Sequence, residues 1–239
     1  MSLYGKDRRY TWGVIRNAQL VPVYMPDWTL RVYVAADPMQ SELAVPPRIL
    51  NKLRLLGAEI ARVSTNNTMS PRNWRLLVAA DQNLDYFLVR DADTRLTDRE
   101  AVAVIDWLTS TKKNIVHCVR DHPKHTNQGL VDGLWGGRPR ELRQLVNKQV
   151  TDILELASTF DTSKTEISSV LNEVLWPAVA HIAYCHDSVS PCKRWRPVTS
   201  RHPFPTSRLG KEYVGQKYDH NQQFYSKDGN QLKQNVVCY

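Results

Sequence analysis

Apolar residues recur along the first ~185 residues in two patterns that alternate with each other. Short runs rich in β-branched and aromatic residues predict strands, at residues 12–18, 30–36, 59–64, 86–89, 114–121 and 129–137. Apolar residues spaced by three or four positions predict helices, at 46–58, 70–80, from Thr97 onward, at 139–157 and at 163–183. Strands that alternate with helices pair in parallel. The pattern therefore predicts an α/β fold with a mostly parallel central sheet between two helical layers, a three-layer α/β/α arrangement.

Several predicted helices carry start signals. Ser70 precedes a proline at the first helical position, a usual N-terminal arrangement. Thr97 with Glu100, and Ser163 with Glu166, have the spacing of a capping box. These signals support the helical assignments that follow each of them.

The basic charge of the chain is concentrated after residue 188, where helical and strand periodicity fades. Residues 189–239 contain nine Lys and Arg against three Asp and Glu, a net +6 of the chain's +8. We therefore divide the chain into a folded domain, 1–188, and a basic, irregular C-terminal tail, 189–239, that docks on the domain. Such a tail meets anionic partners or is a solvated extension.

The stretch "YFLVRDADTR", residues 86–95, places two acids where a predicted strand ends. Residues i and i+2 of a strand point to the same side, so Asp91 and Asp93 can face one space. A divalent cation with oxygen ligands, Mn²⁺ or Mg²⁺, relieves the repulsion between them. The alternative is a strand-end turn in which Arg90 and Arg95 pair with the acids.

Other nucleotide and nucleophile motifs are missing from the sequence. There is no Gly-x-Gly-x-x-Gly fingerprint, no Walker-type Gly-Lys-Ser/Thr and no Gly-x-Ser-x-Gly elbow. A phosphatase with an aspartyl nucleophile also ends a strand in Asp-x-Asp, but it requires Thr or Val where this chain has Arg95. The acid pair therefore favours metal binding over these chemistries.

One histidine and four cysteines are further candidates for chemistry. His186 follows a long predicted helix and lies at its junction with a loop, where a third metal ligand can come from. Cys185 and Cys192 have no zinc-ligand spacing. Without a secretory signal we expect free thiols, with a short Cys185–Cys192 bridge as the alternative.

The order of "LVRDADTRLTDREAVAVIDWL", "RDHPKH", "GLWGG", "HDS" and "PFPTSR" along the chain is more specific than Asp-x-Asp alone. Together these motifs resemble the small GT-A glycosyltransferases of large DNA viruses of algae and of some bacteria and protists. The resemblance runs from about Gly13 to Asp219. It implies a GT-A fold and a transferase that moves a hexose or pentose from a nucleoside diphosphate donor, often UDP, to a glycan or glycoprotein acceptor.

The resemblance also assigns residues to roles. It implies Mn²⁺ or Mg²⁺ held by Asp91, Asp93 and His186, with the metal bridging to the diphosphate. It places the donor against Arg16, Asn17, Arg75, Lys193 and, near the ribose, Asp91, although the spacing from His186 to Lys193 departs from the family's motif.

Inverting transfer needs a carboxylate base, and the candidates are Asp121 and Asp132. The choice between inversion and retention stays open.

The chain departs from the family at two places. Ile167 and Ser168 stand where relatives carry Asp-Gln, and Asp132 stands where glycine is expected. These departures motivate an alternative function, a degenerate relative that binds nucleotide or glycan without turnover.

A third hypothesis, nucleic-acid binding through the basic tail, has the least support from the sequence. No apolar run is long enough to span a bilayer, and the N-terminus lacks an apolar signal segment. We therefore expect a cytoplasmic location, in the host cytoplasm if the protein is viral.

Overall fold

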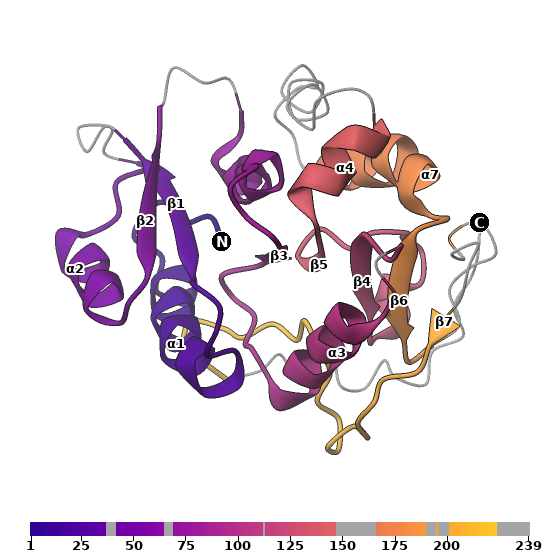
Figure 1. Cartoon of the computed structure of the whole chain (residues 1–239). Coiled ribbons are helices and arrows are strands. Elements are labelled where there is room, and N and C mark those ends of the chain that lie inside the picture. Colours follow the sequence, from indigo (N-terminus) through magenta and orange to yellow (C-terminus); the bar gives the residue numbers. More distant parts are fainter. Residues whose placement is uncertain are drawn as a thin grey trace.

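The computed structural model of the protein describes residues 1–36, 42–64, 69–111, 113–146, 166–189, 195 and 201–223 (Figure 1). Its strands are β1 (Arg31–Ala35), β2 (Glu59–Val63), β3 (Phe87–Arg90), β4 (Val116–Arg120), β5 (Leu134–Gly137), β6 (Ala183–Asp187) and β7 (Arg201–His202). Its helices are α1 (Arg8–Tyr24), α2 (Pro47–Leu55), α3 (Asp98–Thr109), α4 (Pro139–Val146), α6 (Glu166–Ser169) and α7 (Trp176–Val179), with a π-helical segment η3 (Val170–Leu175) and the 3₁₀ segments η1 (Pro71–Ala80) and η2 (Pro123–His125).

The described strands form two sheets. β1 and β2 pair in parallel, and the larger sheet has the order β3-β5-β4-β6-β7. In the larger sheet β5 runs antiparallel to both β3 and β4, whereas β4–β6 and β6–β7 are parallel. The fold is mixed α/β as predicted, but the prediction of a mostly parallel central sheet is wrong. The physical reason is the connection from β4 to β5, which contains the short η2 turn and no crossover helix of the kind that parallel neighbours need.

Helices cover both faces of the larger sheet (Figure 1). On one face α4, η3 and α7 bury Leu142, Leu175 and Val179 against the strands. On the other face α3 buries Val104 and Trp107. The smaller sheet packs against α1 and α2, and η1 contacts both β1 and β3. Whether this arrangement is the GT-A fold stays a prediction.

The strand predicted at residues 12–18 is wrong, because these residues lie inside α1. Thr11, Val14, Ile15 and Ala18 are buried, and their spacing is that of one helical face. The side chain of Asp7 caps the helix by accepting from the N–H of Arg9 at 2.8 Å. The helical spacing and the capping aspartate were both present in the sequence.

The helix predicted to run to residue 183 is also wrong at its end. The helical segments stop at Val179, and residues 183–187 form β6, which is buried throughout. His186 therefore lies inside a strand and not at a junction of helix and loop. β6 pairs with β4 and β7, so its neighbours come from distant parts of the chain, which local periodicity does not report.

The other predicted elements agree more closely with the structure. β1, β2, β3, β4, α2 and α3 lie where the patterns place them, and Thr97 caps α3 by accepting from the N–H of Glu100 at 3.2 Å. The helix predicted at 70–80 is the 3₁₀ segment η1, and Ser70 makes no side-chain cap. The part of the predicted helix 139–157 that follows α4, residues 147–157, and Ser163 lie outside the described residues.

Candidate functional site

The two aspartates of the "DAD" stretch lie in the turn that follows β3. The carbonyl of Asp91 accepts from the N–H of Thr94 at 3.4 Å and from its hydroxyl at 2.9 Å, which closes the turn. The side chain of Asp93 is 2% exposed, whereas that of Asp91 is 21% exposed. The turn therefore carries one enclosed and one partly open carboxylate.

Both carboxylates face the same cation, Lys217. Its Nζ lies 3.7 Å from Oδ2 of Asp91 and 3.9 Å from Oδ2 of Asp93. The i, i+2 spacing thus brings the two acids to one space, and an ammonium group of the C-terminal segment lies in it. Because Lys217 is 43% exposed, its ion pairs are screened by solvent and are weak individually.

Each acid also has an arginine partner. Nη1 of Arg75 donates to Oδ1 of Asp91 at 2.5 Å, and Arg9, near the start of α1, donates to Asp93. Burial by itself would raise the pKa of Asp91, but the charges of Arg75 and Lys217 outweigh burial and lower the pKa below its usual value. Asp91 is therefore ionised and balanced by protein cations.

The two arginines beside the acids in sequence have other partners. Arg90 is buried and pairs with Glu100 of α3. Arg95 lies 4.5 Å from the ring centroid of Tyr218 and donates to Gln222. The alternative explanation, in which Arg90 and Arg95 pair with the acids, is therefore wrong. The arginines that pair with Asp91 and Asp93 come from segments distant in sequence.

Helix α1 holds the acidic turn in place. A side chain at Gly13 would bring its Cβ within 2.1 Å of the carbonyl oxygen of Ala92, so the helix approaches the turn only because this residue is glycine. The buried amide of Asn17 donates to the carbonyl of Thr94 at 2.8 Å and accepts from the N–H of Leu96 at 3.0 Å. Asn17, predicted to contact the donor, is a positioning residue for the turn in this geometry.

Of the other two predicted donor contacts, Arg16 is not brought to the acids. Arg16 is exposed on α1, and its Nη1 donates to Gln19 at 3.2 Å. Lys193 lies outside the described residues. Arg75 is therefore the predicted donor-binding cation that the structure places beside the acid pair.

Arg75 and Asp132 have unused hydrogen-bonding atoms next to Asp91. Within the described part of the chain, the buried Nε and Nη2 of Arg75 and Oδ1 of Asp132 have no hydrogen-bond partner. Burial raises the pKa of Asp132; Arg75 opposes this increase and Asp91 adds to it. A Cβ on Gly133 would lie 2.7 Å from Cγ of Asp91, so glycine gives the carboxylate its place.

Asp121, the other candidate base, is fully buried and saturated with donors. Its carboxylate accepts from Nε of Arg99 at 2.9 Å, from Arg208 at 2.8 Å and from the N–H of Val214 at 2.9 Å, and Ser188 also donates to it. Burial opposes ionisation, but these hydrogen bonds lower the pKa of Asp121. The residue fixes the C-terminal segment against β4, and a proton acceptor is better provided by Asp132.

His186 lies in a buried polar chain on β6. Its Nδ1 is 2.9 Å from Nε2 of His117, and its Nε2 is 3.1 Å from Oδ2 of Asp106 on α3. Burial lowers the pKa of His186 to about 4, and Asp106 opposes the decrease in part. Both ring nitrogens are engaged, so the predicted role of His186 as a ligand beside Asp91 and Asp93 does not fit this geometry.

The buried His186 predicts a pH dependence of stability. An unfolded chain protonates this histidine below about pH 6.5, whereas the folded chain keeps it neutral down to about pH 4. Stability therefore falls as the pH drops through this window, and we expect the free energy of unfolding to lose roughly 2 kcal/mol between pH 7 and pH 5 from this group. Urea unfolding at the two pH values measures it. His186→Gln should lose less free energy of unfolding between pH 7 and pH 5 than the native protein. His220→Gln, at an exposed position, should lose as much as the native protein. An equal loss in all three proteins would contradict the assignment.

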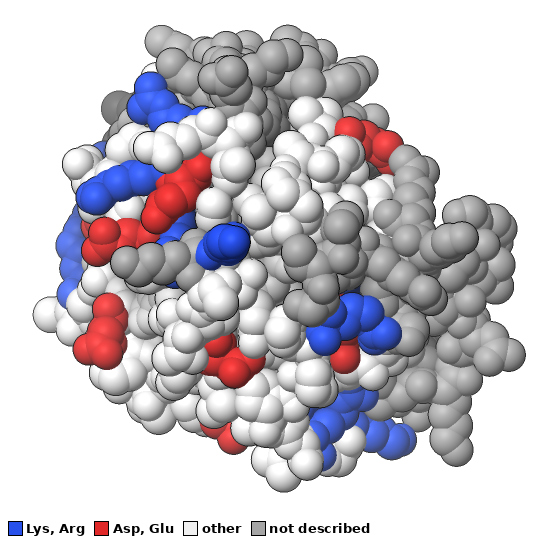
Figure 2. All heavy atoms as spheres, turned by 45° about the vertical axis from the view of Figure 1, so that its right-hand side comes forward, with Lys and Arg blue, Asp and Glu red and all other residues white. Residues whose placement is uncertain are grey.

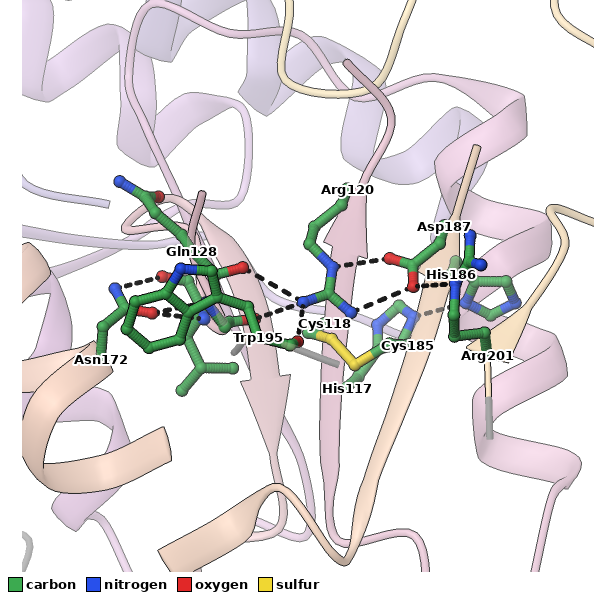
Figure 3. The surroundings of a disulfide bond; sticks show 12 residues. His117, Cys118, Arg120, Gln128, Asn172, Cys185, His186, Asp187, Trp195 and Arg201 are labelled. Carbon is green, nitrogen blue, oxygen red and sulfur yellow. Dashed lines mark hydrogen bonds and ion pairs between the residues drawn. A yellow bond between two sulfur atoms is a disulfide. The ribbon is translucent and has the colours of Figure 1, made fainter. Parts of the chain in front are cut away.

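A disulfide and a buried ion pair join β4 to β6 (Figure 3). Cys118 and Cys185 are register partners on the two strands and form a disulfide, with their Cα atoms 4.6 Å apart. The expectation of free thiols is therefore wrong for Cys118 and Cys185, and so is the alternative Cys185–Cys192 bridge. Cys192 and Cys238 lie outside the described residues. Reducing compartments keep thiols reduced, so this bond is more typical of an oxidising environment than of the predicted cytoplasm.

The residues fit a divalent cation only in part. Two carboxylates that converge on one cation are oxygen ligands of the kind that Mg²⁺ and Mn²⁺ take, and such ions complete their coordination with water and phosphate oxygens. Among the residues that the structure describes, no group of three His, Cys, Asp or Glu side chains can hold a metal ion. Asp91 and Asp93 are thus a candidate pair of ligands, and His186 is not a third.

Sequence reasoning missed Lys217 and Arg9. Both reach the site from the ends of the described chain, Arg9 from α1 and Lys217 from residues 201–223. The N–H of Tyr218 donates to the carbonyl of Asp93 at 2.9 Å, which fixes Lys217 beside the acids. No local pattern marks either residue, because only the packing of the two termini brings them together.

Basic and acidic side chains are interspersed on the described surface in Figure 2. Among the described residues drawn there, Lys and Arg form no continuous basic surface of the kind that follows a nucleic-acid backbone. None of the described helices is long and apolar enough to cross a membrane. Nucleic-acid binding through the tail stays a prediction without support from this face.

No family model, no curated protein and no solved structure matches this chain. Any function must therefore be argued from the site itself. In this mixed α/β protein the site consists of the acid pair after β3, of Arg75, two of whose nitrogens have no hydrogen-bond partner in the described residues, and of Asp132, whose pKa is raised.

Proposed function

We propose that the protein is a GT-A-type glycosyltransferase that transfers a sugar from a nucleoside diphosphate donor, with UDP as the first nucleotide to test, to a hydroxyl of a glycan or glycoprotein. The observation that carries the proposal is the convergence of Asp91 and Asp93 on one cation within 4.0 Å. Two acids that share a cation at the end of a strand are suited to hold a divalent ion together with a diphosphate.

In this proposal Asp91 and Asp93 would hold Mn²⁺ or Mg²⁺ in the place that the ammonium group of Lys217 takes. When bound, the ion supplies positive charge that stabilises the leaving diphosphate. Arg75 keeps Asp91 oriented through Nη1, and its Nε and Nη2 are left to donate to phosphate oxygens as a bidentate pair.

Asp132 is the proposed base. Its raised pKa makes it a stronger proton acceptor than Asp121, whose pKa is lowered. It takes the proton of the acceptor hydroxyl while that oxygen bonds to the anomeric carbon and the bond from this carbon to the diphosphate breaks.

Donor hydrolysis tests the proposal. A transferase slowly releases nucleoside diphosphate from its donor without an acceptor, so we expect metal-dependent release from at least one common nucleotide sugar and none with EDTA. Asp132→Asn should lower the release, whereas Asp98→Asn, at an exposed position on α3, should not. Absence of release from every nucleotide sugar would contradict enzymatic transfer.

A second candidate function is binding of nucleotide or glycan without turnover. It is favoured by the protein cations that already balance both acids: Arg75, Arg9 and Lys217. Nucleotide binding without metal and without hydrolysis would support this function.

Replacing Lys217 tests whether it competes with the metal. Because a unit charge about 4 Å from a carboxylate is worth ~1 kcal/mol or more near a surface, Lys217→Met should raise Mn²⁺ affinity roughly tenfold. Calorimetry with Mn²⁺ measures the change, and Lys211→Met, an exposed lysine of the same segment, is the control. A loss of UDP affinity in Lys217→Met would instead make Lys217 itself the cation that binds the donor.

A further inference from the structure

The start of α1 brings an aromatic ring to the acid pair. Arg9 donates to the carboxylate of Asp93, and the Cζ atom of Arg9 lies 5.3 Å from the ring centroid of Tyr10. A single guanidinium group is thus next to both the ring and the acid. The charges of Asp93 and Lys217 also act on the hydroxyl of Tyr10. Tyr10 is therefore a neighbour of the proposed metal site.

The side chain of Tyr10 is anchored but not closed off from solvent. It is half-buried and packs against the apolar cluster that α1 shares with the smaller sheet. Arg9, the cation over its ring, is 23% exposed. Tyr4, which is 38% exposed, acts electrostatically on the hydroxyl of Tyr10 and adds a second ring nearby. The surface next to Asp93 therefore offers aromatic side chains that a flat ligand can reach.

A second tyrosine near the acids, Tyr218, is less available. Its N–H donates to the carbonyl of Asp93 at 2.9 Å, and the guanidinium of Arg95 lies 4.5 Å from its ring centroid. Arg95 is itself buried, whereas Arg9 is partly exposed. A buried guanidinium covers the ring of Tyr218 more firmly than Arg9 covers that of Tyr10. Of these two rings, that of Tyr10 is the better surface for a ligand.

The flat part of a nucleoside diphosphate is its base. Bases stack on aromatic rings and on the planes of guanidinium groups, and Tyr10 and Arg9 supply one of each beside Asp93. Burial raises the pKa of Tyr10 and the charge of Arg9 opposes the increase, so the hydroxyl keeps its proton at neutral pH. It can therefore donate a hydrogen bond to an acceptor on the edge of a base.

We propose that Tyr10, together with the guanidinium of Arg9, holds the base of the nucleoside diphosphate. The inference rests on the proposed function, because it takes the diphosphate to lie at Asp91 and Asp93. Stacking tolerates different bases, since every base has a π-face. Tyr10 therefore selects nucleotides as a class over diphosphates that lack a base.

Two probes test the proposal by calorimetry in Mn²⁺: UDP, and ribose 5-diphosphate, which keeps the sugar and the diphosphate and lacks the base. We expect UDP to bind the native protein roughly tenfold more tightly or better, from the stacking of its base. Tyr10→Leu should lose this difference, with UDP weakened and ribose 5-diphosphate unchanged. Tyr10→Phe keeps the ring and should keep most of the preference for UDP. A Tyr10→Leu variant that weakens both probes equally would overturn the assignment of the base to Tyr10.

Two control variants fix the location of the base. Trp12→Leu removes a 48% exposed ring of the same helix, which lies 5.9 Å from the Cζ atom of Arg8, and should leave the binding of both probes unchanged. Tyr218→Leu should also keep the preference for UDP, and a selective loss there and not in Tyr10→Leu would overturn the location.

The native protein alone decides the inference where Tyr10→Leu does not fold. Equal affinities for UDP and ribose 5-diphosphate would overturn the role of Tyr10 and leave the proposed metal and diphosphate site standing. Binding of neither probe would overturn that site as well, so the two failures are distinguishable.

Discussion

Asp93→Asn is expected to lower the Mn²⁺-dependent affinity for UDP by roughly 100-fold or more, because a hard cation loses an anionic ligand that an amide replaces poorly. The fold should persist. Asn keeps the volume of the buried side chain, and Arg9, which is 23% exposed, can be solvated, so we expect a loss of about 1 kcal/mol in the free energy of unfolding. Calorimetry with UDP in Mn²⁺ and in EDTA measures the binding.

The matched control for this variant is Asp98→Asn, which removes an exposed carboxylate close in sequence and outside the turn. Its UDP affinity should equal that of the native protein. If Asp93→Asn binds UDP and Mn²⁺ with native affinity, Asp93 is a partner of Arg9 alone and the proposed metal site is wrong. A variant that loses affinity equally with and without metal would point to the nucleotide-binding alternative.

The elements that sequence predicted well are those whose pattern is local. The buried runs of β1 and β4, and the capped amphipathic α3, fix their own secondary structure. Local pattern fails at residues 12–18, where an apolar run predicts a strand although its buried positions have helical spacing. It fails again at β6, whose strand conformation depends on pairing with β4. The antiparallel β5 belongs to the same class, because strand direction depends on the connection and not on composition.

The candidate site divides in the same way. The spacing of Asp91 and Asp93 was enough to predict that their side chains share one space. The cations that fill that space were not predictable from local pattern. Arg9 is 84 residues and Lys217 is 124 residues away from Asp93 in sequence, although both contact it. The pairing of Cys118 with Cys185 is equally non-local, since it follows from the parallel register of two strands.

Arg120→Met is expected to cost about 3–5 kcal/mol in the free energy of unfolding, since it leaves a buried carboxylate without its main partner. The guanidinium of Arg120 bonds both oxygens of Asp187, at 2.6 and 3.0 Å, and both side chains are fully buried (Figure 3). Its Nη1 also donates to the carbonyls of Gln128 and Trp195, at 3.1 and 2.8 Å. The arginine therefore ties β4 to β6 and to the backbone of Gln128 and Trp195 at once. Urea unfolding with the disulfide intact measures the loss.

Two further variants separate the pair from a general effect of removing charge. Arg140→Met breaks an exposed pair with Asp85 at 4.0 Å and should change stability by less than about 1 kcal/mol. The double variant Arg120→Met with Asp187→Leu removes both buried charges and should recover much of the loss, because apolar residues of similar size often replace a buried pair without penalty. Arg201, which bonds Asp187 at 3.1 Å and is 37% exposed, can turn to solvent in that variant. A single Arg120→Met variant as stable as the native protein would mean that Arg201 alone balances Asp187, and the ion pair would then not be what holds β4 and β6 together.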